Sequence, residues 1–232
     1  AIIILFGKKL PMKGSEIGLL SMIASLVLAG GTAMQWIDRV NSGAEGQFIS
    51  PVVHTWNWWQ IGGMKFTIGQ SIDGLAVIIL VVVAFISTLV QLYSTEYLKG
   101  DRRYTHFFAA LTLFSAGMLA MVIAEDTILF LLGWEIMGLC SFMLIGHWWE
   151  DGANSRAALK AFFTVRTGDM GLLVGVAMLY FASNEWTTKH LGVSGFSIRG
   201  ISAWALSGEP NSTVILVAAV ALFIAAIGKS GQ

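Results

Sequence analysis

The chain has 232 residues, of which 56% are hydrophobic and only 12% are charged, and its formal net charge is zero. Soluble domains carry about 25% charged residues, and a soluble protein of this length has too little interior to bury so many apolar side chains. The composition therefore excludes an ordinary soluble domain, and the balanced charge argues against a nucleic-acid partner.

Long apolar runs follow one another along the chain, and each is long enough to cross a bilayer as a helix, which takes about 20 residues. The runs are continuously apolar rather than alternating, which excludes a closed barrel. The predicted fold is all-α, a polytopic transmembrane helix bundle in which residues 1–232 form a single transmembrane domain. Its helices are expected at 16–37, 72–95, 105–124, 127–146, 157–182 and 212–232.

Both ends of the sequence are interpreted as cut. Residues 1–6 are apolar but too few to span a bilayer, so they are expected to be the tail of a truncated helix. The last apolar run is likewise expected to be cut at residue 232. Two longer linkers, 38–71 and 183–211, contain tryptophans of the kind that gather at membrane interfaces.

Basic residues predict the orientation of the helices. If the loops alternate between the two sides, the side that holds Lys8, Arg102 and Arg156 has more Lys and Arg than the side of the two long linkers. Loops rich in Lys and Arg remain on the side from which a membrane protein is inserted. This side is therefore expected to face the cytoplasm of a bacterium, or the matrix if the membrane is the mitochondrial inner membrane.

Four ionisable residues interrupt the apolar runs: Glu135, Arg166, Asp169 and Lys229. A charge at mid-bilayer costs about 2.5–3.5 kcal/mol, so these side chains are expected to face the protein interior or water and to be paired. Helical rise puts Glu135 about 13 Å from one side, and Arg166 and Asp169 about 14 and 18 Å from the other. In a hydrocarbon core of about 30 Å the three residues share one level. Arg166 and Asp169 are three residues apart and so share a helix face.

More than one role fits these charges. Arg166 and Asp169 alone would fit a static clamp between helices, and Glu135 alone would fit a protonated packing residue. A proton path fits the whole set, since buried carboxylates and amines hold their protons according to their neighbours. Other polar residues are expected at the boundaries: His147 near the interface, and three solvated carboxylates at helix ends, Asp73, Glu125 and Asp126.

Five segments carry a resemblance to a known family. Residues 133–146 read GWEIMGLCSFMLIG, and residues 160–169 read KAFFTVRTGD; shorter matches are IDGL at 72–75, YSTEY at 93–97 and GKSGQ at 228–232. Together they resemble the antiporter-like subunits of respiratory complex I (NADH–quinone oxidoreductase), and most closely the N-terminal part of the chain 5, or L, subunits. Gly231 departs from the family pattern, which has alanine there.

The resemblance implies roles for the buried charges. Glu135 matches a glutamate that is proposed to pair with the lysine matched by Lys229, and Asp169 and Arg166 match residues close to that pair. Pairing and separation of the two charges is thought to drive proton transfer in the family. These four residues are the candidate proton-translocation residues of this chain.

The predicted function is that of a proton-translocating membrane subunit of NADH–quinone oxidoreductase, which acts as part of an enzyme without redox chemistry of its own. No catalytic or metal-binding residue is expected on this chain, whose single cysteine is Cys140. The resemblance implies that NADH, FMN, iron–sulfur clusters and quinone bind to partner subunits, and that the partners are the other membrane subunits of complex I and the bilayer. The alternative is the large subunit of an Mrp-type cation/proton antiporter, which shares the same charged residues.

Overall fold

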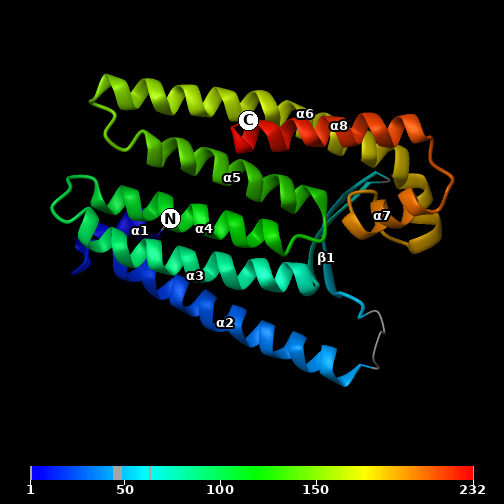
Figure 1. Cartoon of the computed structure of the whole chain (residues 1–232), viewed down its shortest axis with the longest axis horizontal. Helices are drawn as coiled ribbons and strands as arrows, with labels where there is room; N and C mark the ends of the chain where they lie inside the picture. Colours follow the sequence, from blue (N-terminus) through cyan, green and yellow to red (C-terminus); the bar gives the residue numbers. More distant parts are fainter. Residues whose placement is uncertain (1, 44–48, 63, 232) are drawn as a thin grey trace.

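The computed structural model describes residues 2–43, 49–62 and 64–231, and it is mostly helical (Figure 1). A short helix α1 (Ile2–Phe6) and a 3-10 turn (Gly7–Lys9) precede the first long helix. The remaining elements are, in order, α2 (Ser15–Ser42), β1 (Val52–Ile61), β2 (Met64–Ile72), α3 (Gly74–Tyr97), α4 (Tyr104–Val122), α5 (Thr127–Ile145), α6 (Gly152–Leu191), α7 (Ile198–Leu206) and α8 (Ser212–Ser230).

Capping residues mark the ends of several of the long helices. Asp73 accepts a hydrogen bond from the backbone N–H of Ala76, and Asn211 accepts one from Thr213, so each caps the helix that follows it. Gly192 ends α6 in the left-handed conformation, with a φ of 66°, which glycine adopts without steric cost. Six helices in the described part of the chain are long and apolar enough to cross a membrane, and each overlaps one of the predicted runs.

The long helices lie roughly antiparallel, in the order α2, α3, α4 and α5, followed by the pair α6 and α8 (Figure 1). Glycines let α6 and α8 approach closely: a Cβ added at Gly168 would lie 3.0 Å from the Cα of Gly228, and one added at Gly171 would lie 2.5 Å from the carbonyl oxygen of Ala221. Small residues at a helix interface bring backbones together in this way.

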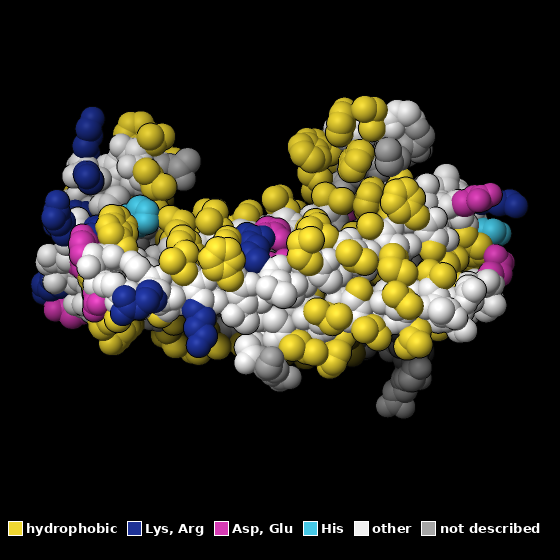
Figure 2. Space-filling model, turned by 90° about the horizontal axis from the view of Figure 1, so that it is seen from above, with side chains coloured by type: hydrophobic (Ala, Val, Ile, Leu, Met, Phe, Trp, Pro, Cys, Tyr) yellow, Lys and Arg dark blue, Asp and Glu magenta, His cyan; other side chains and the backbone are white. Residues whose placement is uncertain are grey.

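The connections segregate to two ends of the molecule. The α3–α4 and α5–α6 loops lie at the same end as α1, while the hairpin and α7 lie at the opposite end (Figure 1). On the face drawn in Figure 2, Lys and Arg side chains gather mostly at the first of these ends. The loops with Lys8, Arg102 and Arg156 therefore share one end, as the alternation of helices requires.

Both long linkers contain regular structure that the sequence reading missed. Within 38–71, β1 and β2 form an antiparallel hairpin with Val52 opposite Ile72 and a bulge between Asn57 and Trp59; residues 44–48 and 63 lie outside the described residues. Exposed tryptophans along β1 hide the alternation that usually marks a strand. Helix α6 continues past residue 182 to Leu191, and α7 occupies part of 183–211. The apolar run of α6 predicts only the segment that would cross the bilayer, and the helix extends beyond that segment.

Candidate functional site

The predicted buried charges lie on three neighbouring helices: Glu135 on α5, Arg166 and Asp169 on α6, and Lys229 on α8. The guanidinium of Arg166 forms an ion pair with the Glu135 carboxylate and lies 3.5 Å from the Asp169 carboxylate. One cation thus connects carboxylates of two helices. Figure 2 shows a cation beside a carboxylate about half-way along an otherwise mainly apolar face. The shared depth of Glu135, Arg166 and Asp169 agrees with the helical arithmetic.

The members of this charge cluster differ in exposure. The side chain of Asp169 is 4% exposed, whereas those of Glu135 and Arg166 are 28% and 33% exposed. The guanidinium of Arg166 also lies 5.0 Å from the ring centroid of Phe162. Two carboxylates and two cations make the cluster electrically balanced, which limits the cost of holding charge among apolar helices.

Lys229 does not pair with Glu135 in this structure. Its amine donates a hydrogen bond of 3.3 Å to the backbone carbonyl of Trp134 and lies 4.9 Å from the centre of that indole ring. In the part of the chain that the structure describes, no ion pair joins Lys229 to a carboxylate. The Glu135 carboxylate forms its ion pair with Arg166 instead.

Trp134 is a site residue that the sequence reading missed. Its indole N–H donates a hydrogen bond of 2.5 Å to Asp169, across from α5 to α6. Trp134 is the eighth residue of the apolar run 127–146, far from the interfacial belt where tryptophan is enriched. This depth was the signal in the sequence that would have pointed to a polar partner for the indole.

Glu125 and Asp126 correct the expectation of solvated helix ends. Glu125 is 2% exposed and Asp126 is 0% exposed, because the hairpin and the start of α7 cover them. Asp126 accepts hydrogen bonds from the backbone N–H groups of Gly69 and Leu129. Glu125 accepts one of 2.5 Å from the Ser197 hydroxyl. The α4–α5 turn therefore joins the hairpin, α5 and α7.

Burial raises the pKa of both carboxyls in this turn. For Glu125, loss of hydration outweighs the Ser197 hydrogen bond and the charge of Arg199, which lower its pKa, and the Asp126 charge raises it further. For Asp126, burial likewise outweighs its backbone hydrogen bonds. A carboxyl whose pKa is raised in the folded state makes the folded state more stable at low pH than at high pH. Its stabilisation is complete below the ordinary pKa, which is 4.5 for Glu125, and is lost as the pH rises through the native pKa.

Glu125→Gln is therefore expected to weaken the pH dependence of this junction, because the amide has no charge to bury. Hydrogen exchange of the Ile198 amide, which bonds the Glu125 carbonyl, measures the opening of the junction. In the wild type, protection should fall as the pH rises above the ordinary carboxyl pKa of 4.5, after correction for intrinsic exchange, and in the variant it should fall less. Glu209→Gln, at an exposed position, is the matched control. An equal slope in Glu125→Gln and wild type would contradict the assignment.

His147 lies at the opposite end of the molecule, just after α5, and its side chain is 4% exposed. Its ring is 3.3 Å from the Asp101 carboxylate, which also accepts a hydrogen bond of 2.9 Å from the Trp148 indole. Burial by itself would raise the pKa of Asp101, but the N–H of Arg103, the Trp148 indole and the neighbouring His147 together lower it. This group of residues joins the α3–α4 loop to the α5–α6 loop.

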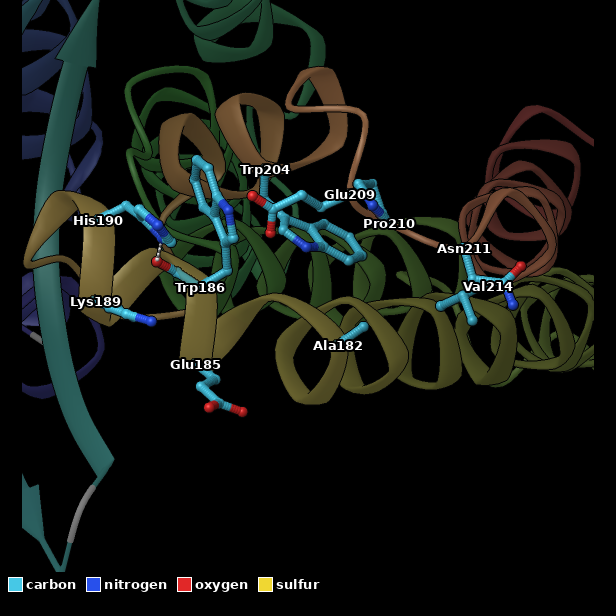
Figure 3. Close-up of a pocket in the computed structure, with 10 residues that line it drawn as sticks. All are labelled: Ala182, Glu185, Trp186, Lys189, His190, Trp204, Glu209, Pro210, Asn211 and Val214. Atoms are coloured by element: carbon cyan, nitrogen blue, oxygen red, sulfur yellow. Dashed lines mark hydrogen bonds between the residues drawn. The ribbon is translucent and has the colours of Figure 1, made fainter.

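A surface cavity of about 410 Å³ lies between the end of α6, α7 and the start of α8 (Figure 3). Trp186, Trp204, Glu185, Lys189 and Glu209 are among its lining residues. Within it, the His190 ring lies 3.0 Å from the Trp186 carbonyl. None of the four predicted site residues lines this cavity. The charge cluster is therefore a separate feature, and it is the candidate functional site.

The fold and the site together define a polytopic helical membrane protein with ionisable side chains held between its helices. The family described as NADH-ubiquinone oxidoreductase (complex I), chain 5 N-terminus matches residues 58–108, and the family described as NADH:quinone oxidoreductase/Mrp antiporter, transmembrane region, matches residues 124–232. The chain is an integral membrane protein and belongs to the antiporter-like family that includes chain 5 of complex I.

Curated relatives agree with this assignment. The chain is 33% identical over 209 residues to NAD(P)H-quinone oxidoreductase chain 5 of Synechocystis sp., covering 90% of this chain and 28% of the relative. It is 32% identical to the chloroplastic subunit 5 of Anthoceros angustus, covering 77% of this chain and 24% of that protein. The chain thus spans about a quarter of the length of these relatives.

Two solved structures share the fold. The Mrp complex from Dietzia sp. superimposes with a TM-score of 0.67 at 22% identity, over 98% of this chain and 22% of that chain. An archaeal membrane-bound sulfane sulfur reductase superimposes with a TM-score of 0.73 at 16% identity, over 97% of this chain and 41% of that chain.

Proposed function

We propose that this chain is part of a proton-translocating membrane subunit of NADH–quinone oxidoreductase. The observation that carries the proposal is the charge cluster of Glu135, Arg166, Asp169 and Lys229 between apolar helices of a chain in this family. Buried charges are costly, and in membrane proteins they mark ion pathways.

The cluster has the contacts that a proton relay needs. Arg166 lies within reach of two carboxylates, and Lys229 is held by a carbonyl and an aromatic ring. If Arg166 moved toward Asp169, the Glu135 carboxylate would be released to accept the Lys229 amine. Desolvation disfavours an isolated buried charge and pairing favours it, so an exchange of partners changes which group holds a proton.

The redox chemistry is proposed to reside on partner chains. NADH, FMN, iron–sulfur clusters and quinone would bind there, and quinone reduction would drive the exchange of partners in this subunit. A protein iron–sulfur cluster is held by several cysteines, and the sequence contains only Cys140. The direct partners are proposed to be other membrane subunits of the same complex.

The end of the molecule with Lys8, Arg102 and Arg156 is proposed to face the cytoplasm, or the matrix in a mitochondrion. The greater number of basic residues at this end supports the proposal. In inverted membrane vesicles, a cysteine placed at Ser155 in the α5–α6 loop should react with an impermeant reagent, while one at Ser194 should not. The reverse pattern would overturn the orientation.

Lys229→Met in the full-length subunit of the assembled complex tests the proposed function. Methionine keeps the length of the side chain and removes the ammonium group, so proton uptake per NADH oxidised is expected to fall about tenfold or more in the same inverted vesicles. Lys160→Met, at an exposed position of α6, is the matched control and should pump normally.

Two outcomes would contradict the proposal. One is wild-type proton uptake in Lys229→Met. The other is sodium–proton exchange by the wild type without an electron donor, which would favour the Mrp-type antiporter instead.

A further inference from the structure

Trp134 on α5 contacts charged residues of two other helices, α6 and α8. Its indole N–H donates the 2.5 Å hydrogen bond to Asp169 of α6. Its backbone carbonyl accepts the 3.3 Å hydrogen bond from Lys229 of α8, whose amine also lies 4.9 Å from the ring centroid. Trp134 therefore touches one carboxylate and one amine of the charge cluster by different parts of the same residue.

Apolar packing sets the orientation of this indole. Trp134 packs against the buried residues Leu172, Val176 and Ala225, and its ring lies 5.9 Å from that of Phe130. The Lys229 nitrogen also lies beside Gly138, one helical turn further along α5, since a Cβ added at Gly138 would lie 3.9 Å from it. The ring is therefore held by its neighbours, and the charged groups are positioned on it.

We propose that Trp134 is a positioning residue of the proton path: its indole N–H holds Asp169, and its backbone carbonyl and ring face hold Lys229, without a direct ion pair between the two charges. This inference rests on the proposed function. Attraction between opposite charges grows steeply as they approach in a poorly polarisable interior, so a direct buried pair would be slow to separate. The ring face and the backbone carbonyl of Trp134 stabilise the ammonium group of Lys229 only in part. Lys229 can therefore still leave these contacts and pair with a carboxylate.

Trp134→Phe in the full-length subunit of the assembled complex tests this role. Phenylalanine keeps an aromatic face for the amine but removes the donor to Asp169. Proton uptake per NADH is expected to fall about three- to tenfold at neutral pH, because a hydrogen bond to a charged group is lost. The pH dependence of proton uptake should also change, because the Asp169 carboxylate no longer accepts a hydrogen bond from the residue at position 134.

Two further variants sharpen the result. Trp134→Leu also removes the aromatic face and should lower proton uptake further than Trp134→Phe. Trp149→Phe is the matched control. The ring centroid of Trp149 lies 3.5 Å from the guanidinium carbon of Arg103, so this tryptophan also contacts a cation. It lies in the α5–α6 loop, away from the charge cluster. Its pH profile should remain that of the wild type. NADH–ferricyanide activity normalises each measurement to the amount of assembled complex.

The outcomes separate this inference from the proposed function. If Lys229→Met and Asp169→Asn lower proton uptake but Trp134→Phe keeps the wild-type pH profile, Trp134 only packs and the inference is overturned. If Lys229→Met and Asp169→Asn pump normally, the proposed function itself fails. Should Trp134→Phe not assemble, a benzothienylalanine at position 134, which keeps the bicyclic shape and lacks the N–H, provides the same measurement.

Discussion

Glu135→Gln is expected to lower proton uptake per NADH oxidised by about tenfold or more in the full-length subunit. The substitution nearly keeps the shape of the side chain but removes one of the two carboxylates near Arg166. The guanidinium is then left with Asp169 alone, and the cluster carries a net positive charge between apolar helices. Lys229 also loses the carboxylate with which it would form an ion pair during the exchange of partners.

Complex assembly should survive Glu135→Gln, because the amide oxygen can still accept a hydrogen bond from Arg166. Glu135→Asp, which keeps the charge on a shorter side chain, should impair pumping less. Glu96→Gln is a matched control, since Glu96 forms an exposed ion pair with Lys99 at the end of α3. The measurement is proton uptake in reconstituted vesicles. Wild-type rate and stoichiometry in Glu135→Gln would show that the Glu135–Arg166 pair is only structural.

Gly171→Ala is expected to destabilise the contact between α6 and α8. The added methyl carbon would lie 2.5 Å from the Ala221 carbonyl oxygen, a backbone atom that cannot move without displacing α8. Overpacking of this kind costs about 1–3 kcal/mol. The shift of α8 would also carry Lys229 away from Trp134, so proton uptake should fall together with stability.

Gly30→Ala in α2 is the matched control, because no atom lies within 4 Å of a Cβ added there. It should be neutral or stabilising by up to about 1 kcal/mol, since alanine favours a helix more than glycine does. The measurement is the temperature at which the subunit is released from the purified complex. An unchanged release temperature for Gly171→Ala would mean that α6 and α8 are less tightly packed than the structure shows.

The positions of the apolar helices, and the depth of the charges within them, could be predicted from the amino-acid sequence alone. Hydrophobicity and helical rise are local properties, so the level shared by Glu135, Arg166 and Asp169 could be calculated without any knowledge of the neighbours. The spacing of three residues likewise placed Arg166 and Asp169 on one face of α6. The proton-translocation role of these residues came from resemblance and stays a prediction.

The partners of these charges depend on how the helices pack against one another. Depth along a helix says nothing of how the helix is rotated or which helix lies beside it, so the sequence left open that Glu135 pairs with Arg166 and Lys229 with the Trp134 carbonyl. Glu125 and Asp126 make the same point at the α4–α5 turn. They read as solvated ends because the hairpin residue that covers them, Gly69, is more than fifty positions away in the chain, and burial depends on which distant segment folds over a residue.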